Sequence, residues 1–138
     1  MASFITDQAL YSEATGDIVY STNTFKVMLL TGTATPSKTT WMHRSDVTNE
    51  VVGTGYTTGG ATATFSVAAQ NTSTNQVVIT LGGATWTSST ITAAYAVYYK
   101  STGSAATDTL VAVVDFGGNV TSTNASFTLT SSTITKQN

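Results

Sequence analysis

The hydrophobic positions of this chain fall into short runs, and most of these runs alternate small or polar residues with apolar ones, which is typical of β-strands. Residues 24–31 read TFKVMLLT. Because apolar side chains occupy consecutive positions there, the pattern predicts a strand that is buried on both faces. Further strands are predicted at residues 61–67, 76–81, 91–100, 110–116 and 126–130.

One helix is predicted near the N-terminus, over about Asp7–Thr15. Thr6 or Asp7 can cap its first turn, and Gly16 stands where a glycine commonly ends a helix. A short strand is predicted directly afterwards, at residues 17–20. The pattern of residues 41–52 fits either one helical turn or the start of a strand, and the sequence leaves this open.

Glycine-containing and hydroxyl-rich segments separate the predicted strands. Connections are expected at residues 32–40, which hold the single proline, and at residues 82–83, 101–108 and 117–119. Many short strands between such turns favour a sandwich or barrel, and no internal repeat or linker divides the chain. The expected fold is therefore one all-β domain over residues 1–138, a β-sandwich for which a jelly-roll-like arrangement is one option, with a short N-terminal helix.

Composition narrows the function classes. Charged residues make up 9% of the chain and the net charge is −2, against about 25% charged residues in an ordinary soluble protein. This balance argues against a basic nucleic-acid surface and against a polybasic membrane patch. The chain has no cysteine but 31 threonines and 15 serines, a third of its residues. Threonine is β-branched and suits the surface of a sheet.

The stretch Gly53–Gly60 reads G-x-G-x-x-x-G-G and looks at first like a phosphate-binding loop. A P-loop requires a lysine that is missing here, and a dinucleotide fingerprint leads from a strand into a helix. The residues that follow predict a strand. We therefore interpret this stretch as a loop, or a set of bulges, in which glycine permits sharp turns.

The candidates for chemistry are few. On a helix, His43, Asp46 and Glu50 would share one face and could hold a metal. The interpretation we favour is that they are solvated loop residues with Arg44 and Lys38 as ion partners. His43 is also the only base for a catalytic triad, and no G-x-S-x-G motif accompanies it. We expect no catalysis, no cofactor and no bound metal.

Apolar side chains outside the predicted strands are candidates for partner contacts. Phe4 and Ile5 precede the helix, and Trp41 and Met42 follow the proline loop. Such residues are either packed into the domain or held for a partner, and we predict contacts with a partner at these four. The remaining aromatic candidates for an interface are Trp86, Tyr95, Tyr98 and Tyr99. For Trp86, Tyr95 and Tyr99, core packing is at least as good an explanation.

Nearly the whole chain, in order, resembles a family of small structural proteins of tailed bacteriophages. The strand at residues 24–31 opens the likeness, followed by Thr35-Pro36. The later landmarks are the histidine-containing residues 43–51, the glycine block 53–60, Trp86 with residues 88–93, Tyr99-Lys100 and residues 114–117. The chain departs from the family's pattern after Ile134, where Lys136-Gln137-Asn138 replaces a final apolar strand. This departure leaves open whether a last strand forms.

The resemblance implies a virion structural protein, and among such roles we expect a capsid cement, or decoration, protein. It would bind the major capsid protein, associate with itself as a dimer or trimer, and stabilise the expanded, DNA-filled head. Its place would be the outer surface of the virion. Residues 1–10 lack the pattern of a signal peptide, so we expect synthesis in the host cytoplasm. No nucleic acid and no membrane is expected as a partner.

Two other functions remain open at this stage. A tail-fibre or head-fibre adhesin would share the Thr/Ser/Gly composition, although fibres are usually longer and repetitive. A small carbohydrate-binding or hydrolytic module would use Trp41 as a sugar platform and Asp46 with Glu50 as paired carboxylates.

Overall fold

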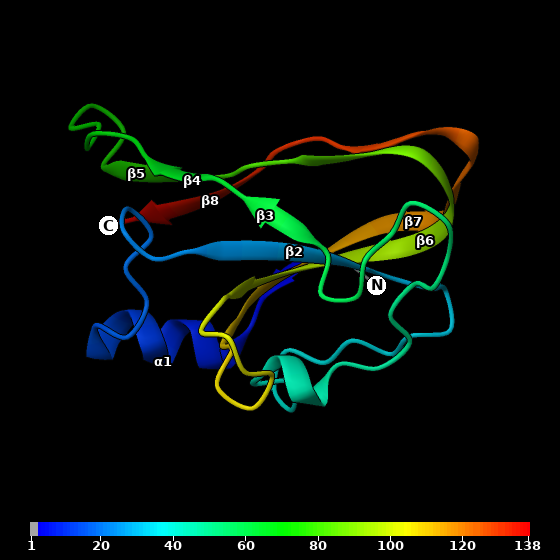
Figure 1. Cartoon of the computed structure of the whole chain (residues 1–138). Helices are drawn as coiled ribbons and strands as arrows, with labels where there is room; N and C mark the ends of the chain where they lie inside the picture. Colours follow the sequence, from blue (N-terminus) through cyan, green and yellow to red (C-terminus); the bar gives the residue numbers. More distant parts are fainter. Residues whose placement is uncertain (1–2) are drawn as a thin grey trace.

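The computed structural model describes residues 3–138. The first two residues of the N-terminal segment 1–10, which lacks the pattern of a signal peptide, lie outside the described residues. The chain forms two antiparallel sheets and one N-terminal helix, which confirms the all-β, sandwich-like fold (Figure 1). The strand orders are β1-β7-β6-β2-β3 and β4-β5-β8. The strands are β1 Phe4–Ile5, β2 Phe25–Leu30, β3 Ala61–Ala63, β4 Phe65–Val67, β5 Gln76–Leu81, β6 Ala84–Lys100, β7 Leu110–Leu129 and β8 Ser132–Gln137.

Strand β2 is buried on both faces, as its sequence predicts. Val27 and Leu29 belong to the core between the sheets, whereas Met28 and Leu30 belong to a second apolar cluster on the opposite face. Loops cover that opposite face and contribute Ala34, Trp41 and Val47 to its cluster. The N-terminal helix also lies below the larger sheet in Figure 1, but its buried residue Ala9 packs in the core between the sheets. The alternation follows from the two-residue period of a strand, and it needs an apolar side chain at every position.

The helix α1 spans Asp7–Thr15 as expected. The Thr6 hydroxyl accepts a hydrogen bond from the Ala9 amide at 3.1 Å, and Gly16 ends the helix at a φ of 82°. The strand predicted at residues 17–20 is wrong. The amides of Thr22 and Asn23 both donate to the Val19 carbonyl, so the chain turns there. The Val19 carbonyl is therefore not available to pair with a neighbouring strand.

Strands β5 to β8 form one long two-stranded ribbon. Leu81 faces Ser132 in the β5–β8 pair, and Ala84 faces Leu129 in the β6–β7 pair, so the register is unchanged across Gly82 and Gly83. The sequence suggested a connection there, but the ribbon continues through it. A side chain at either glycine would collide with backbone, because its Cβ would lie 2.3 Å from the Thr64 carbonyl oxygen or 1.9 Å from that of Leu129.

The ribbon then bends, so that β6 and β7 contribute to both layers (right side of Figure 1). Ser88 and Asn124 have positive φ values of 48° and 46°, and the β6–β7 register shifts beside them. The predicted connection at residues 117–119 is also wrong. These residues lie within β7, where Gly117 and Gly118 form a bulge in place of a turn.

The run at residues 61–67 divides into two strands in different sheets. Strand β3 pairs with β2, and β4 pairs with β5 after the chain crosses at Thr64. The C-terminus forms the last strand that the sequence left open. Strand β8 pairs with β5 along its whole length, because Ile134 packs inward and the Lys136 ammonium reaches the Glu13 carboxylate at 2.7 Å.

Candidate functional site

Phe4 and Ile5, two of the predicted contact residues, form the edge strand β1. Phe4 pairs with Val113 and Ile5 with Ala112, and both side chains are half-buried. They line a hollow of about 250 Å³ between β1 and β8, which we call the β1–β8 hollow. Its other lining residues are Ser3, Leu81, Ala112, Val113, Val114, Ser132, Thr133, Ile134 and Thr135. This is the open side of the sandwich.

Trp41 and Met42 are adjacent in sequence but differ in exposure. Trp41 is 7% exposed and packs with Met28 and Leu30 in the second apolar cluster. Met42 is 44% exposed, while its carbonyl accepts a hydrogen bond from the Leu110 amide at 2.9 Å. The indole is therefore packed into the domain, which is one of the two options for such a residue, and it offers no exposed sugar platform.

The loops around Met42 are held by a buried carboxylate that the sequence reading did not single out. Asp108 is 1% exposed and accepts hydrogen bonds from Arg44 Nε at 2.7 Å and from the Thr102 amide at 2.6 Å. Burial opposes ionisation of Asp108, but the hydrogen bonds from Thr102 and Arg44 together hold its pKa below the usual value. The Arg44 guanidinium also lies 5.4 Å from the centre of the Tyr99 ring.

His43, Asp46 and Glu50 do not share a helix face. A single 3-10 turn, Arg44–Asp46, is all the helix that forms, and Asp46 accepts from the amides of Met42 and His43. The amides of His43 and Met42 hold the pKa of Asp46 below its usual value. The Glu50 carboxylate instead binds the Tyr56 hydroxyl and the Gly59 amide. Within residues 3–138, no group of three or more His, Cys, Asp or Glu side chains could hold a metal ion.

The Gly53–Gly60 block is a loop with positive φ at Gly55, Gly59 and Gly60, as the sequence interpretation expects, and its glycines also permit close packing. A Cβ at Gly55 would lie 2.8 Å from the Ser89 Cα, and a Cβ at Gly60 would lie 1.8 Å from the Val27 carbonyl oxygen. The loop therefore lies directly on the bend of the ribbon and on β2. Burial raises the pKa of Tyr99 to about 12, and its hydroxyl donates to the Gly59 carbonyl at 2.5 Å.

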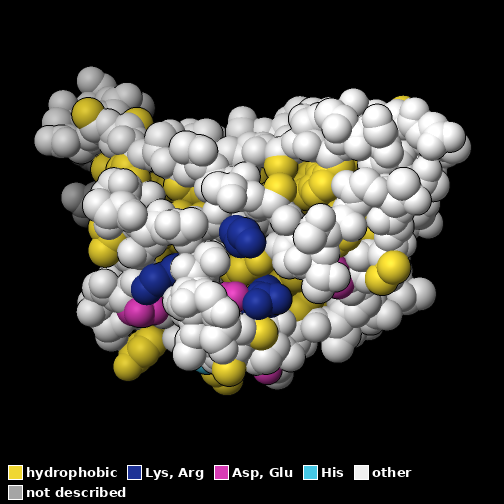
Figure 2. Space-filling view, viewed as in Figure 1, with side chains coloured by type: hydrophobic (Ala, Val, Ile, Leu, Met, Phe, Trp, Pro, Cys, Tyr) yellow, Lys and Arg dark blue, Asp and Glu magenta, His cyan; other side chains and the backbone are white. Residues whose placement is uncertain are grey.

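The distribution of charge is the main surface feature. Residues 51–99 and 116–135 contain no Asp, Glu, Lys, Arg or His. They include β3, β4, β5, nearly all of β6, the second half of β7 and most of β8. We call the surface that they form the charge-free face. Figure 2 shows no charged side chain in its upper part, whereas the Lys, Arg, Asp and Glu side chains gather over the middle and lower parts.

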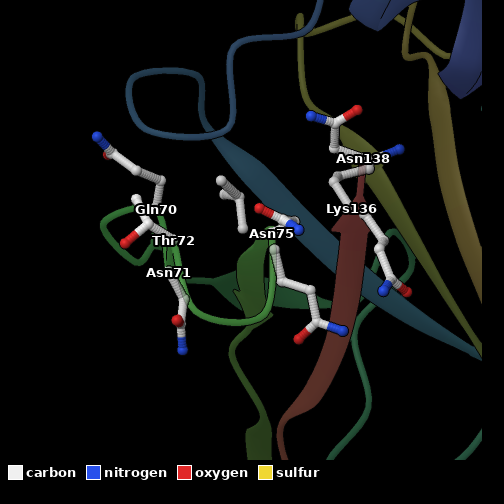
Figure 3. Close-up of a pocket in the computed structure, with 9 residues that line it drawn as sticks. Gln70, Asn71, Thr72, Asn75, Lys136 and Asn138 are labelled. Carbon is white, nitrogen blue, oxygen red and sulfur yellow. The ribbon is translucent and has the colours of Figure 1, made fainter.

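A second hollow, of about 450 Å³, lies at the end of the smaller sheet. Figure 3 shows side chains from the loop at residues 70–75 on one side and from the C-terminal strand on the other. We call it the amide hollow, because most of its lining side chains carry amides. The lining residues are Gln70, Asn71, Thr72, Asn75, Gln76, Val77, Lys136, Gln137 and Asn138.

The aromatic residues that the sequence left between core and interface are mostly core. Trp86, Tyr98 and Tyr99 are each buried, and Tyr95 packs against the second apolar cluster.

No family model, no curated protein and no solved structure matches this chain. No helix among the described residues is long and apolar enough to cross a membrane.

Proposed function

We propose that this protein is a capsid cement protein of a tailed bacteriophage. It binds the major capsid protein on the virion surface and stabilises the expanded, DNA-filled head. The observation that carries the proposal is the charge-free face, which extends over the smaller sheet and the adjoining ribbon. Its hydroxyl and amide side chains keep the surface hydrated without creating a field that would repel closely spaced copies.

The architecture supports such a role. A cement protein bridges neighbouring capsid subunits and adds contact area that rupture must break. The long β6–β7 ribbon joins both layers of the sandwich, so a load on one layer passes to the other through backbone hydrogen bonds. A closed dimer or trimer of such a module would bridge subunits at a symmetry axis.

We assign the capsid contact to the layer that covers the outer face of the larger sheet. Met42 is the most exposed of the four predicted contact residues, and Leu10 and Tyr11 of α1 are 50% and 65% exposed. The first turn of α1 is tied to the Met42 segment, because the Asp7 amide donates to the Lys38 carbonyl at 2.9 Å. This layer combines exposed apolar side chains with the ion pairs Arg44–Asp108 and Lys100–Asp17, as the core and rim of a protein interface combine apolar and charged residues.

Binding to heads tests the proposal directly. Purified protein is mixed with undecorated expanded heads of the phage that encodes it, and bound copies are counted after sedimentation. We expect on the order of hundreds of copies per head, as a repeated cyclic contact on a capsid requires, and a higher temperature of head rupture. No binding, or on the order of ten copies at one vertex, would contradict a cement role.

A matched pair of variants tests the assigned surface. Met42→Ala and Val120→Ala each shorten an apolar side chain of similar exposure, 44% and 47%. Val120 lies on β7 within the charge-free face. We expect Met42→Ala to weaken head binding about tenfold and Val120→Ala to change it little. If both variants bound heads with equal affinity, the capsid contact would not lie at Met42. Trp41→Ala is unsuitable here, because loss of a buried indole destabilises the fold.

A second candidate is a glycan-binding head-fibre or tail-fibre module, and the amide hollow favours it. Asn and Gln side chains can donate to and accept from sugar hydroxyls, and six of the nine lining residues are Asn or Gln. Titration with host surface glycans separates the two functions. Saturable binding that Asn71→Ala abolishes, together with few copies per virion, would favour the fibre module over the cement protein.

A further inference from the structure

Strand β8 is the longest of the four strands that end the two sheets. The other three edge strands, β1, β3 and β4, are two or three residues long, whereas β8 has six. Natural proteins guard exposed edges by keeping them short or by placing charges and prolines on them. The first device protects three edges here and is absent from the fourth.

The register of the smaller sheet shows which β8 groups are free. Val78 directs its carbonyl to the β4 side, since it accepts from the Ala68 amide at 2.9 Å. Backbone groups alternate sides along an antiparallel strand, so the neighbours of Val78 on β5 direct theirs to β8. Hence Ser132, Ile134 and Lys136 bond to β5, with which they pair. The amides and carbonyls of Thr133, Thr135 and Gln137 point away from the sheet.

The charge that could guard this edge is engaged elsewhere. Lys136 is the only charged residue of β8, and its ammonium lies 2.7 Å from the Glu13 carboxylate of α1. The side chains of Thr133, Thr135 and Gln137 are exposed and uncharged. An approaching strand therefore meets free backbone groups and no unpaired charge.

We propose that two copies of this chain pair antiparallel through β8 and form one continuous six-stranded sheet across a two-fold axis. The inference goes beyond the proposed function, because the pairing needs no capsid protein. An antiparallel edge is its own complement under a two-fold axis, so a second copy satisfies the free groups without any other partner.

One register uses all the free groups. With the axis at Thr135, this residue pairs with Thr135 of the second copy, and Thr133 pairs with Gln137 of that copy. Each outward amide then meets an outward carbonyl, and two threonine side chains meet across the strands on the outer face, a favourable cross-strand pair. The added strand also lies beside the β1–β8 hollow and covers the side chains of Ile5 and Ile134 that line it.

Amide hydrogen exchange of the full chain, followed by NMR over a concentration series, tests the pairing residue by residue. Thr133, Thr135 and Gln137 are expected to exchange at least about tenfold more slowly at high than at low protein concentration. Ser132, Ile134 and Lys136 should be protected at every concentration, since they bond to β5. Phe65 and Val67, whose amides point outward from β4, serve as controls and should exchange fast throughout.

A proline variant provides the second arm. Thr135→Pro removes one outward amide and no bond to β5, and proline is tolerated at such an edge position. We expect the wild-type chain to sediment with twice the mass of one chain and the variant with the mass of a single chain. Val67→Pro is the matched control, because it removes an outward amide from the opposite edge of the same sheet, and it should remain dimeric.

Three results would overturn the proposal. The first is a wild-type chain that stays monomeric up to millimolar concentration. The second is a dimer whose Thr133, Thr135 and Gln137 amides exchange at the same rate at all concentrations, which decides the matter even if Thr135→Pro does not fold. The third is protection of these amides only after capsid protein is added, which would assign the edge to that partner and leave the proposed cement function intact.

Discussion

Two buried serines fasten the bend of the ribbon. Ser89 is fully buried, and its hydroxyl lies 3.0 Å from the Trp86 carbonyl oxygen, 2.9 Å from that of Ala125 and 2.8 Å from the Ser122 hydroxyl. Ser122 in turn bonds the backbone of Ser89 and Ile91. The bend interrupts the ladder between β6 and β7, so the hydroxyls satisfy backbone groups that the strands leave unpaired.

Ser89→Ala should therefore destabilise the protein by about 1–3 kcal/mol, the cost of buried polar groups that lose a partner. Thr85→Ala is the control, since Thr85 is exposed and its hydroxyl meets only Thr128 at 3.5 Å. That variant should lie within about 0.5 kcal/mol of wild type. Urea unfolding measures both. A Ser89→Ala variant as stable as Thr85→Ala would show that the hydroxyl network does not hold the bend.

Asp108 makes stability depend on pH in a defined direction. Its folded-state pKa is lowered, so the unfolded chain binds its proton more readily than the native one. The contribution of Asp108 is therefore fully present above the ordinary carboxyl pKa of about 3.9, and it is lost as the pH falls through the lower folded value.

Asp108→Asn should cost about 1–3 kcal/mol at neutral pH, because the variant loses a charged acceptor of hydrogen bonds from Arg44 and Thr102. The difference from wild type should begin to shrink as the pH falls below about 4, where the unfolded chain takes up the proton, and it should be lost below the lower folded pKa of Asp108. Urea unfolding at a series of pH values measures it. If the stability difference between Asp108→Asn and wild type stayed constant down to the lowest pH, ionisation of Asp108 would not contribute to the pH dependence of stability.

At the scale of elements, glycine decides how closely the segments approach. The loop at residues 53–60 lies on β2, and Gly82 with Gly83 lets the ribbon pass Thr64 and Leu129. Only some of the glycines act in this way. Gly60 and Gly117 have nearly the same φ, 78° and 79°, but Gly60 touches β2 while nothing lies within 4 Å of a Cβ at Gly117.

This pair separates backbone strain from steric collision. Gly117→Ala should cost about 1–2 kcal/mol, the strain of a positive φ for a residue with a side chain. Gly60→Ala carries the same strain and a collision with the Val27 carbonyl oxygen, which should add about 1–3 kcal/mol or more. Thermal and urea unfolding compare the two. If Gly60→Ala and Gly117→Ala lowered the free energy of unfolding equally, the loop could move away from β2 without loss of stability.

At the scale of the whole molecule, the residues that face outward from the β8 edge, Thr133, Thr135 and Gln137, carry no charge. Within residues 3–138, the ion pairs Arg44–Asp108, Lys100–Asp17 and Lys136–Glu13 join loops, helix and strand ends. The charge-free face holds the outer side of the smaller sheet. An assembly through this sheet would depend on backbone hydrogen bonds and hydroxyl contacts instead of long-range attraction.

The β8 dimer should therefore respond little to salt. Its dissociation constant is expected to change by less than about threefold between about 0.05 M and about 0.5 M NaCl, because salt weakens attraction between charges and the outward residues of β8 carry none. Sedimentation equilibrium measures the constant. A steep weakening with salt would point to an interface through the charged layer that contains α1.

The local sequence was enough to predict those elements that depend on neighbouring residues alone. The all-β class, the helix with its Thr6 cap and Gly16 end, and the doubly buried β2 follow from periodicity and capping chemistry. The loop character of Gly53–Gly60 also followed, because the missing lysine and the strand after it exclude a phosphate loop. The capsid role stays a prediction that rests on resemblance and on the charge-free face.

Tertiary contacts decided the rest, since they depend on residues far apart in the chain. Gly82, Gly83 and Gly117 look like turns in sequence, yet long-range pairing carries a ribbon through all three. The polar end of the chain became a strand because β5 offers a complete partner and Glu13 takes the Lys136 charge. Trp41 was packed inside and Met42 left outside by the loop above β2. Sequence set which segments extend, and packing set which of them pair and which edge remains free.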